Sequence, residues 1–353
     1  MNDDIARRFP LVPRPRPACG PLAERVRDVA DLARSARETT GPARQALTAR
    51  AWNNAALIAS DCGLPDLARS LCWGHYDIWA AAQPLDADGA RHALEPLINL
   101  ARLRIRAGDG RGAHQQLDAL HHAVRTRGDT VIDGRAVSFA ALTRTTDDHR
   151  QVVRWLWAVL LAEGIRALVH DGLCSDALAH AERHHGVGRR LLDGRQVLIL
   201  AHVARSDPTA AIAVLDGSEL TTSWERALAA CLIVLCLERT GDPPASAVRT
   251  MTERYLHLRL GTGYEAFATN LAVTIVELAG KADHPDSELI VTHLARETLA
   301  AREGHAARKI LCHPSSASRL TERDRRALSK LVEVSMPAPP EITKSLMKSL
   351  LPP

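Results

Sequence analysis

Apolar residues recur every three to four positions along most of the chain, whereas runs of alternating β-branched residues are absent. The first spacing places apolar side chains on one face of an α-helix, and the second would indicate strands. Glycine and proline interrupt the periodic segments, which predicts about a dozen or more helices joined by short turns. The longest apolar run, Leu228 to Leu237, is too short to cross a bilayer and predicts a buried helix. The pattern predicts an all-α fold.

Three pairs of predicted helices have a similar order of residues. Each pair has small or apolar residues where two antiparallel helices would cross, and a glycine at the turn between them. The first pair also has a tryptophan near its start. The shared positions are Trp52, Ala56, Ala59, Gly63, Ala68 and Cys72 in Ala51 to Asp77; Leu97, Leu100, Ala101, Gly108, Ala113, Leu117 and Leu120 in the second pair; and Leu161, Ile165, Leu168, Gly172, Ala177 and Ala181 in the third.

This order of residues resembles the helical hairpin of tetratricopeptide (TPR) repeats. The resemblance covers about a third of the chain and implies an irregular α-solenoid of antiparallel, TPR-like helical hairpins. The turn glycines are 45 and 64 residues apart, whereas that family repeats about every 34 residues. Inserted helices or loops would explain the difference, and a compact helical domain that contains such hairpins is the alternative. We expect a Pro-rich arm over 1–21, a helical-repeat domain over 22–335 with a candidate subdivision near 130–150, and a Pro-rich tail over 336–353.

The resemblance also implies a binding groove. In TPR proteins, the position two residues before the small crossing residue faces the concave surface, and Asn54 and Asn99 occupy it here. It therefore implies that these amides bond the backbone of an extended peptide or protein partner; a solvated helix face is the alternative. Trp73, Tyr76 and Trp79 follow at intervals of three on one predicted helix. They predict either a stripe that binds the partner or packing in the core.

Chain length and cysteine content indicate what kind of protein this is. A chain of 353 residues is long enough to bury a core without disulfides or structural metals. Its seven cysteines are odd in number and contain no CxxC pair, so we expect reduced thiols, a cytoplasmic protein and no metal site. The N-terminal residues lack the apolar core of an export signal. Arginine supplies 40 of the 45 basic residues, which suggests a GC-rich bacterial genome.

Histidines are the main candidates for catalysis, although no catalytic residue is identified. His180 and His184 are four residues apart and His185 follows them, but the segment lacks the HExxH order of zinc peptidases. A solvated helix end is the alternative. His75 with Asp77 is the other candidate for a general base. The sequence has no GxSxG elbow, phosphate-binding loop or complete GxGxxG motif, so we expect no cofactor.

Two basic segments predict contact with anions, because guanidinium groups bind phosphates well. RNA such as tRNA is therefore a candidate partner, and ordinary surface arginines are the alternative. Leu320 to Val332 resembles the first helix of the response-regulator helix-turn-helix, but the prolines after it leave no recognition helix, so DNA is not an expected partner. Thr321 with Asp324 predicts a capped helix instead. The anion-binding candidates are Arg183, Arg189, Arg190, Arg195, Arg323, Arg325 and Arg326.

Two functions follow as hypotheses. The first is a cytoplasmic TPR-like binding, scaffold or regulatory protein that recognises a peptide or protein partner. The second is a helical transferase of bacterial specialised metabolism that takes an acyl group from an aminoacyl-tRNA or a similar anionic carrier. No membrane partner is expected, since Ile342 to Leu351 is too short and too weakly charged for a membrane-surface helix.

Overall fold

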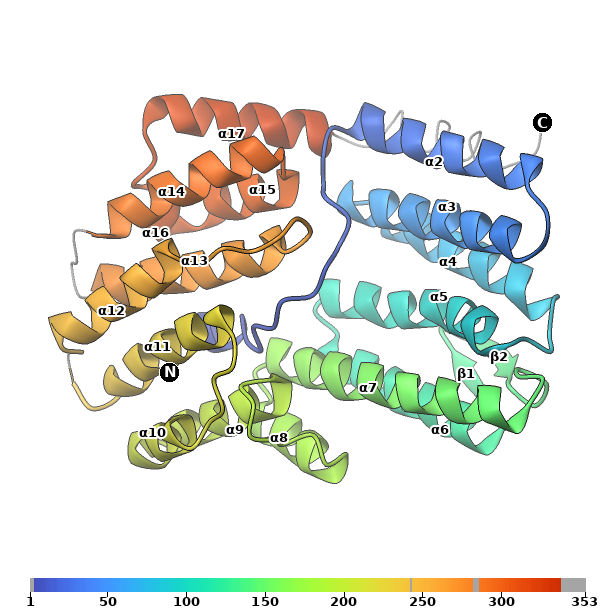
Figure 1. Cartoon of the computed structure of the whole chain (residues 1–353), viewed down its shortest axis with the longest axis horizontal. Coiled ribbons are helices and arrows are strands. Elements are labelled where there is room, and N and C mark those ends of the chain that lie inside the picture. Colours follow the sequence, from blue (N-terminus) through green and yellow to red (C-terminus); the bar gives the residue numbers. More distant parts are fainter. Residues whose placement is uncertain (1–2, 242, 282–285, 338–353) are drawn as a thin grey trace. The chain divides into compact units, whose positions relative to one another are not determined.

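The structure of the chain is a computed structural model that describes residues 3–241, 243–281 and 286–337 (Figure 1). Most of these residues are helical, which confirms the predicted all-α class. Consecutive helices pack against one another as pairs, as they do in a solenoid. Contacts divide the chain into two compact units. Unit 1 contains residues 1–21 and 168–335, and the helices of unit 2 lie in residues 22–167.

Unit 2 contains the three predicted hairpins except for the last helix of the third. Each helix packs against the next, from α2 with α3 to α5 with α6. The helices begin earlier than the predicted hairpins, since α3 starts ten residues before Ala51 and α5 ten residues before Leu97. Their bounds are α2 Leu22–Glu38, α3 Gly41–Asp61, α4 Pro65–Ala80, α5 Ala87–Arg106, α6 Gly110–Thr126 and α7 Thr146–His170.

The predicted turn glycines lie between consecutive helices. Gly63, Gly108 and Gly172 have φ values of 74°, 84° and 76°. This left-handed conformation costs free energy for residues that have a Cβ atom, so glycine is the residue that ends each first helix cleanly. The second helices start close behind these turns, and Asp109 caps α6 by accepting from the backbone N–H of Gly112 at 2.9 Å.

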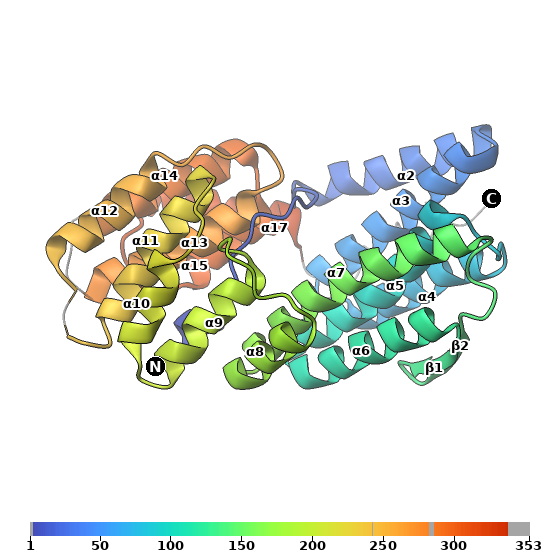
Figure 2. The same cartoon turned by 60° about the horizontal axis from the view of Figure 1, so that its bottom comes forward.

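A β-hairpin follows α6 and was not predicted. Strands β1, Asp129–Ile132, and β2, Arg135–Ser138, pair in antiparallel register (Figure 2). Asp133 and Gly134 form the two-residue turn with φ values of 52° and 81°. Asp-Gly is the residue pair that such a turn favours. The signal was therefore present, but the strands are too short to show a clear alternating pattern.

Unit 1 contains the rest of the helices. The apolar run from Leu228 lies in α11 and is buried, as predicted. Thr321 accepts from the backbone N–H of Asp324 at 3.1 Å, which confirms the predicted cap of the last described helix. The bounds are α1 Asp3–Ala6, α8 Cys174–Arg183, α9 Asp193–Ala204, α10 Pro208–Asp216, α11 Ser223–Leu237, α12 Ala245–Leu256, α13 Glu265–Lys281, α14 Asp286–Ala301, α15 Gly304–Cys312, α16 Pro314–Ala317 and α17 Glu322–Ser335.

The Pro-rich N-terminal segment belongs to unit 1. Ile5, Phe9 and Leu11 are buried in the apolar core of that unit. Most of the predicted C-terminal tail, including Ile342 to Leu351, lies outside the described residues. Among the residues that the structure describes, no helix combines the length and the apolar character needed to span a membrane.

Small side chains at the helix crossings of unit 2 give a first prediction. Ala101 is completely buried in α5, so leucine at this position would overfill the crossing. We expect Ala101→Leu to lower the free energy of unfolding by about 1–3 kcal/mol, measured by urea denaturation. Ala300→Leu is the matched control, because Ala300 is exposed on α14. Equal stability of the two variants would contradict the crossing.

Candidate functional site

The best candidate site lies in unit 2, on the first helices of its hairpins. Asn99 on α5 donates to Oδ1 of Asn53 on α3 at 2.8 Å, and its own Oδ1 accepts from Nη1 of Arg102 at 2.9 Å. Arg102 donates in turn to Glu163 on α7, from Nη2 at 2.7 Å. Arg166 donates to the other oxygen of Glu163 at 2.9 Å. We call these five residues the polar row.

The polar row connects three helices that are not consecutive in the chain. Its asparagines are half-buried, whereas the carboxylate of Glu163 is only 5% exposed. Two arginines neutralise this buried charge, as a buried carboxylate requires. In the described part of the chain, the side-chain nitrogen of Asn53 makes no hydrogen bond. The row is therefore held in place by its charged end and keeps amide donors at its other end.

A pocket of about 440 Å³ opens on the same unit. Trp79, at the end of α4, is 3% exposed and stacks on the ring of His92, with 5.3 Å between ring centroids. The indole N–H of Trp79 is buried and has no partner among the described residues. We call this cavity the Trp79 pocket. It is lined by Pro42, Gln45, Ala46, Trp79, Asp86, Asp88, Gly89, Arg91, His92, Glu95 and Trp155.

The Trp79 pocket contains a charged carboxylate. Burial opposes ionisation of Glu95, but nearby His92, His75 and Arg102 hold the pKa of that carboxyl below its ordinary value. Nδ1 of His92 lies 3.9 Å from Oε2 of Glu95. Burial lowers the pKa of His75 to about 4, so this imidazole is neutral at physiological pH. Glu95 is thus a negative charge in the wall of the pocket.

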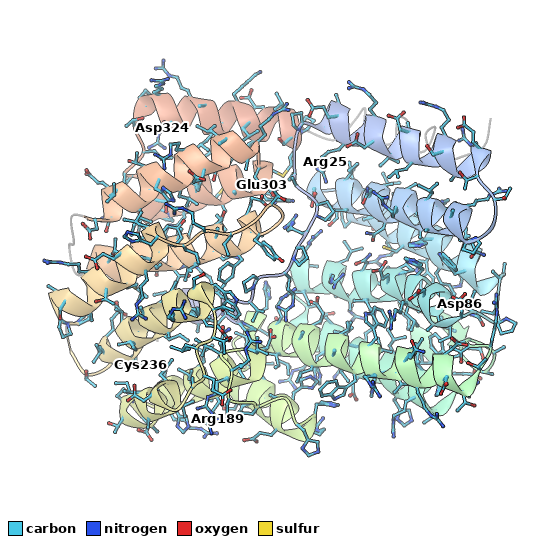
Figure 3. All side chains as sticks on the ribbon, in the orientation of Figure 1. Arg25, Asp86, Arg189, Cys236, Glu303 and Asp324 are labelled. Atoms are coloured by element: carbon cyan, nitrogen blue, oxygen red, sulfur yellow. The ribbon has the colours of Figure 1, made fainter. Side chains whose placement is uncertain are left out.

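One face of α5 carries residues of both the Trp79 pocket and the polar row. His92, Glu95, Asn99 and Arg102 are spaced by three, four and three residues, which places them along one side of a helix. Asp86 caps the start of α5 (Figure 3) and accepts from the backbone N–H of Gly89 at 2.8 Å. The surface formed by α5 with its neighbours α3 and α7 therefore presents a cavity followed by a polar row.

Of the two asparagines predicted to face a groove, Asn99 lies in the polar row and Asn54 does not. Asn99 is a member of the polar row, but its partner on α3 is Asn53 and not Asn54. Asn54 is half-buried, and no contact of its side chain supports a role. Adjacent residues of a helix point about 100° apart, so Asn53 and Asn54 face different sides of α3.

The predicted aromatic stripe divides into two groups. Trp73 and Tyr76 meet edge to face at 5.8 Å, and the guanidinium of Arg135 from β2 lies 4.7 Å from the Trp73 ring centroid. Trp79 instead lines the Trp79 pocket. Asp77 is bound by Arg135, including a contact of 3.1 Å to Nη1, whereas His75 is 1% exposed. The structure therefore does not bring His75 and Asp77 together as a general-base pair.

The other histidine candidates lie at the end of α8. The rings of His180 and His184 are 4.6 Å apart, as their helical spacing predicts. His180 is 1% exposed, and His184 ends the helix as its C-cap residue. His185 is exposed in a left-handed conformation with φ of 52°.

Most of the arginines predicted to bind anions have partners within unit 1. Arg189 pairs with Glu219 at 2.9 Å, and Arg190 pairs with buried Glu225 at 3.0 Å. Arg195 donates to the carbonyl oxygen of Val214 at 2.7 Å. These three arginines connect α9 and the loops around it. Arg183 is exposed at the end of α8.

In the second basic segment, on α17, two of the three predicted arginines also have partners within unit 1. Arg325 donates to the carbonyl oxygen of Ala317 at 2.6 Å, and Arg326 pairs with Glu322 at 2.8 Å along the helix. No contact is shown for Arg323. The segment presents positive charge at the surface, since Arg323 and Arg326 are exposed.

Unit 1 has a smaller pocket of about 260 Å³ that the sequence did not indicate. Tyr255 and His293 meet edge to face in its wall, with 6.1 Å between ring centroids. Burial lowers the pKa of His293 and raises that of Tyr255. Both groups are thereby kept neutral at physiological pH, so the pocket has Glu265 and Glu297 as its ionisable charges.

Known proteins give no further indication of what this site does. Comparison with protein-family models, with curated proteins and with solved structures finds no match. The functional argument therefore depends on the residues of the polar row and of the Trp79 pocket.

Proposed function

We propose that unit 2 is a binding module that recognises an extended peptide segment of a partner protein. The observation that supports this most is the polar row, in which amide and guanidinium groups from three separate helices are connected beside a cavity. Amide side chains can bond the backbone of any extended peptide, and a neighbouring pocket selects one side chain. In this proposal, the helix pairs of unit 2 act as TPR-like hairpins.

The Trp79 pocket supplies the selective part of the proposed site. Two tryptophans line it, and Glu95 and Asp86 add negative charge. Arg91, which also lines the pocket, is paired with Asp88 at 3.2 Å. A cationic side chain of the partner would gain from the ring of the partly exposed Trp155 and from the carboxylates. We propose that the bound peptide places a lysine or an arginine in this pocket.

We place this function in the cytoplasm. Six of the seven cysteines are buried, and no disulfide joins any of them in the structure. Burial raises the pKa of Cys72 to about 12, so that thiol is protonated and unreactive. Thiols of this kind need no oxidising compartment.

Asn99→Ala tests the proposed site. The full chain is used to select binders from a displayed library of random peptides, and the selected peptides are titrated against each variant. We expect Asn99→Ala to weaken binding about 10-fold, which is about 1.4 kcal/mol, because it removes the centre of the polar row. Its effect on the free energy of unfolding should be about 1 kcal/mol.

Gln115→Ala is the matched control, because Gln115 is exposed on α6, outside the polar row. It should bind the selected peptides as the wild type does. Equal binding by Asn99→Ala, or a library that yields no binder, would contradict the proposal. Retention of tRNA with a steep dependence on salt would instead favour the carrier-dependent transferase.

A further inference from the structure

The N-terminal arm, residues 7–21, is held by unit 1 in the way that a protein holds a peptide ligand. From Phe9 to Pro21 it forms neither helix nor strand, and Figure 1 shows it as an extended dark-blue trace. Five prolines, at positions 10, 13, 15, 17 and 21, favour this extended backbone. Phe9, Leu11 and Cys19 are at most 3% exposed, so they act as apolar anchors.

A buried glutamine forms two hydrogen bonds with the backbone of the arm. Gln196 on α9 is completely buried. Its Oε1 accepts from the backbone N–H of Leu11 at 2.7 Å, and its Nε2 donates to the carbonyl oxygen of Leu11 at 2.9 Å. Nε2 also donates to the carbonyl oxygen of Leu191 at 2.9 Å, which fixes the orientation of the amide. This two-point contact would accept any residue in place of Leu11, provided that the backbone is extended.

Carboxylates from two helices bind arginines of the arm. Arg8 donates to Glu277 on α13 at 2.5 Å, and Arg14 donates to Asp193 on α9 at 2.7 Å. Burial opposes ionisation of Glu277, but Arg8 and His313 hold its pKa below the ordinary value, so it is charged. Charge-assisted bonds of this kind are stronger than neutral ones.

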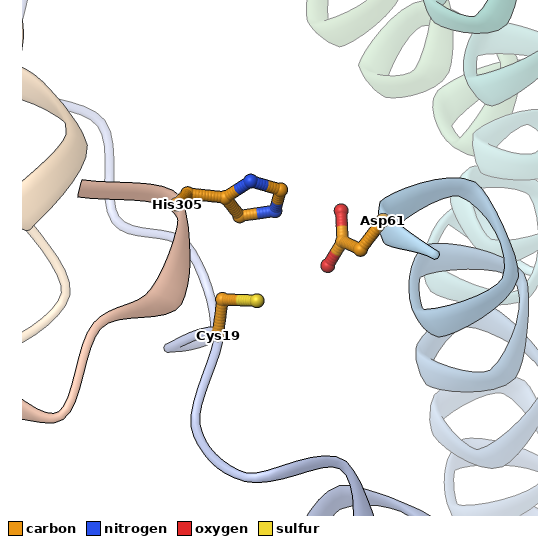
Figure 4. A group of neighbouring side chains, drawn as sticks. All are labelled: Cys19, Asp61 and His305. Atoms are coloured by element: carbon orange, nitrogen blue, oxygen red, sulfur yellow. The ribbon is translucent and has the colours of Figure 1, made fainter. Parts of the chain in front are cut away.

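Backbone contacts hold the distal part of the arm. The N–H of Arg16 donates to the carbonyl oxygen of Gly263 at 3.1 Å. The N–H of Cys19 donates to Oε2 of Glu303 at 3.2 Å, and the carbonyl oxygen of Cys19 accepts from the N–H of Gly304 at 2.8 Å. Figure 4 shows Cys19 on the arm and His305 at the start of α15; Asp61, also drawn there, ends α3 and is bound by Arg25 at 2.6 Å.

The fit of the arm is incomplete at its charged contacts. Nη1 of Arg8, Nη1 of Arg14 and Oδ1 of Asp193 are buried and make no hydrogen bond with described residues. Each buried polar atom without a partner costs about 1–3 kcal/mol. The arm is therefore bound more weakly than its number of contacts suggests, and a ligand that satisfies these atoms could compete with it.

We infer that α9, α13 and α15 form a second peptide-binding site, the arm site, and that residues 8–19 occupy it as a ligand in cis. The arm site is defined by Gln196, Asp193, Glu277 and Glu303. Its external partner is an extended, proline-rich peptide with arginines spaced like Arg8 and Arg14. Such a peptide displaces the arm and takes over its contacts. The inference concerns unit 1 alone and does not depend on the function proposed for unit 2.

The test uses the full chain with a protease site inserted after Gly20, cut once the protein has folded. A fluorescent peptide of residues 1–20 is then added under reducing conditions, and its binding is followed by anisotropy. We expect one labelled peptide to exchange into each cut chain, and unlabelled peptide to compete with it. An Arg14→Ala peptide should bind about 10-fold more weakly. A Pro17→Ala peptide should bind like the wild type, because Pro17 is exposed.

Three results would overturn the inference. The first is a cut arm that does not exchange within a day, because the arm would then be a permanent part of the core. The second is unfolding of the cut chain when the arm dissociates. The third is equal affinity of the Arg14→Ala and wild-type peptides. Displacement of the arm in the uncut chain by excess peptide, seen as a labelled N-terminus that gains mobility, would support the inference independently.

Discussion

We expect Glu225→Gln to lower the free energy of unfolding by about 3 kcal/mol. The carboxylate of Glu225 is completely buried at the start of α11. One of its oxygens accepts from the N–H and hydroxyl groups of Thr221 and Thr222 at 2.8–3.0 Å, and the other accepts from Arg190 at 3.0 Å. A glutamine must turn its NH₂ group toward donors on one side or the other. Urea denaturation at neutral pH measures the loss.

Glu219→Gln is the matched control, because Glu219 is half-exposed and pairs with Arg189 at the surface. An exposed pair of this kind contributes less than about 1 kcal/mol. If Glu219→Gln were as destabilising as Glu225→Gln, the buried hydrogen bonds would not be the cause.

The effect of Glu225 depends on pH in a defined direction. Burial would raise its pKa, but the bonds from Arg190, Thr222 and Thr221 outweigh burial and bring the pKa from 4.5 to about 2. A lowered pKa in the folded state stabilises the protein at pH values above the unfolded value. The difference between wild type and Glu225→Gln should therefore be complete above about pH 4.5 and shrink as the pH falls toward about 2. A constant difference over this range would contradict the assignment.

We expect Gly194→Ala to destabilise unit 1 by about 3 kcal/mol. A Cβ atom at Gly194 would lie 2.2 Å from the carbonyl oxygen of Gly186 and 2.7 Å from its carbonyl carbon. Both atoms belong to the backbone, so the turn after α8 and the start of α9 would have to separate. Thermal denaturation of the full chain measures the loss.

Gly188→Ala is the control for this substitution in the same turn. A Cβ atom at Gly188 would have no neighbour within 4 Å. Alanine there restricts the unfolded chain and should leave stability unchanged or raise it by up to about 1 kcal/mol. Equal destabilisation by the two substitutions would show that the turn tolerates no side chain for another reason.

The hairpins of unit 2 could be predicted because their signals are local. Gly63 and Gly108 mark turns through the backbone conformation that glycine alone adopts easily. Ala101 marks a crossing because a small side chain lets two helices approach. These properties belong to single residues and their near neighbours, so the sequence shows them without the fold.

The candidate site could be predicted only in part, because it depends on rotation and on distant partners. Asn99 has a local signal, whereas the place of Asn53 beside it depends on the rotation of α3. Glu163 lies 61 positions after Arg102 and has no local signal for that contact. The place of the arm in unit 1 is likewise set by Gln196, which is 185 positions from Leu11.

The two proposed binding sites make separate predictions. The polar row and the Trp79 pocket belong to unit 2, and the arm site belongs to unit 1. Asn99→Ala should therefore leave exchange of the arm unchanged. An Arg14→Ala arm should leave binding of library-selected peptides unchanged. Loss of both activities in either variant would indicate a folding defect rather than a binding defect.

The central claim is that the first helices of the hairpins in unit 2, α3, α5 and α7, carry the binding surface. Hydrogen–deuterium exchange of the full chain, with and without a library-selected peptide, tests it directly. We predict slower exchange in α3, α5 and α7 when the peptide is bound, and no change in α6. Protection confined to α6, or to helices of unit 1, would contradict the claim.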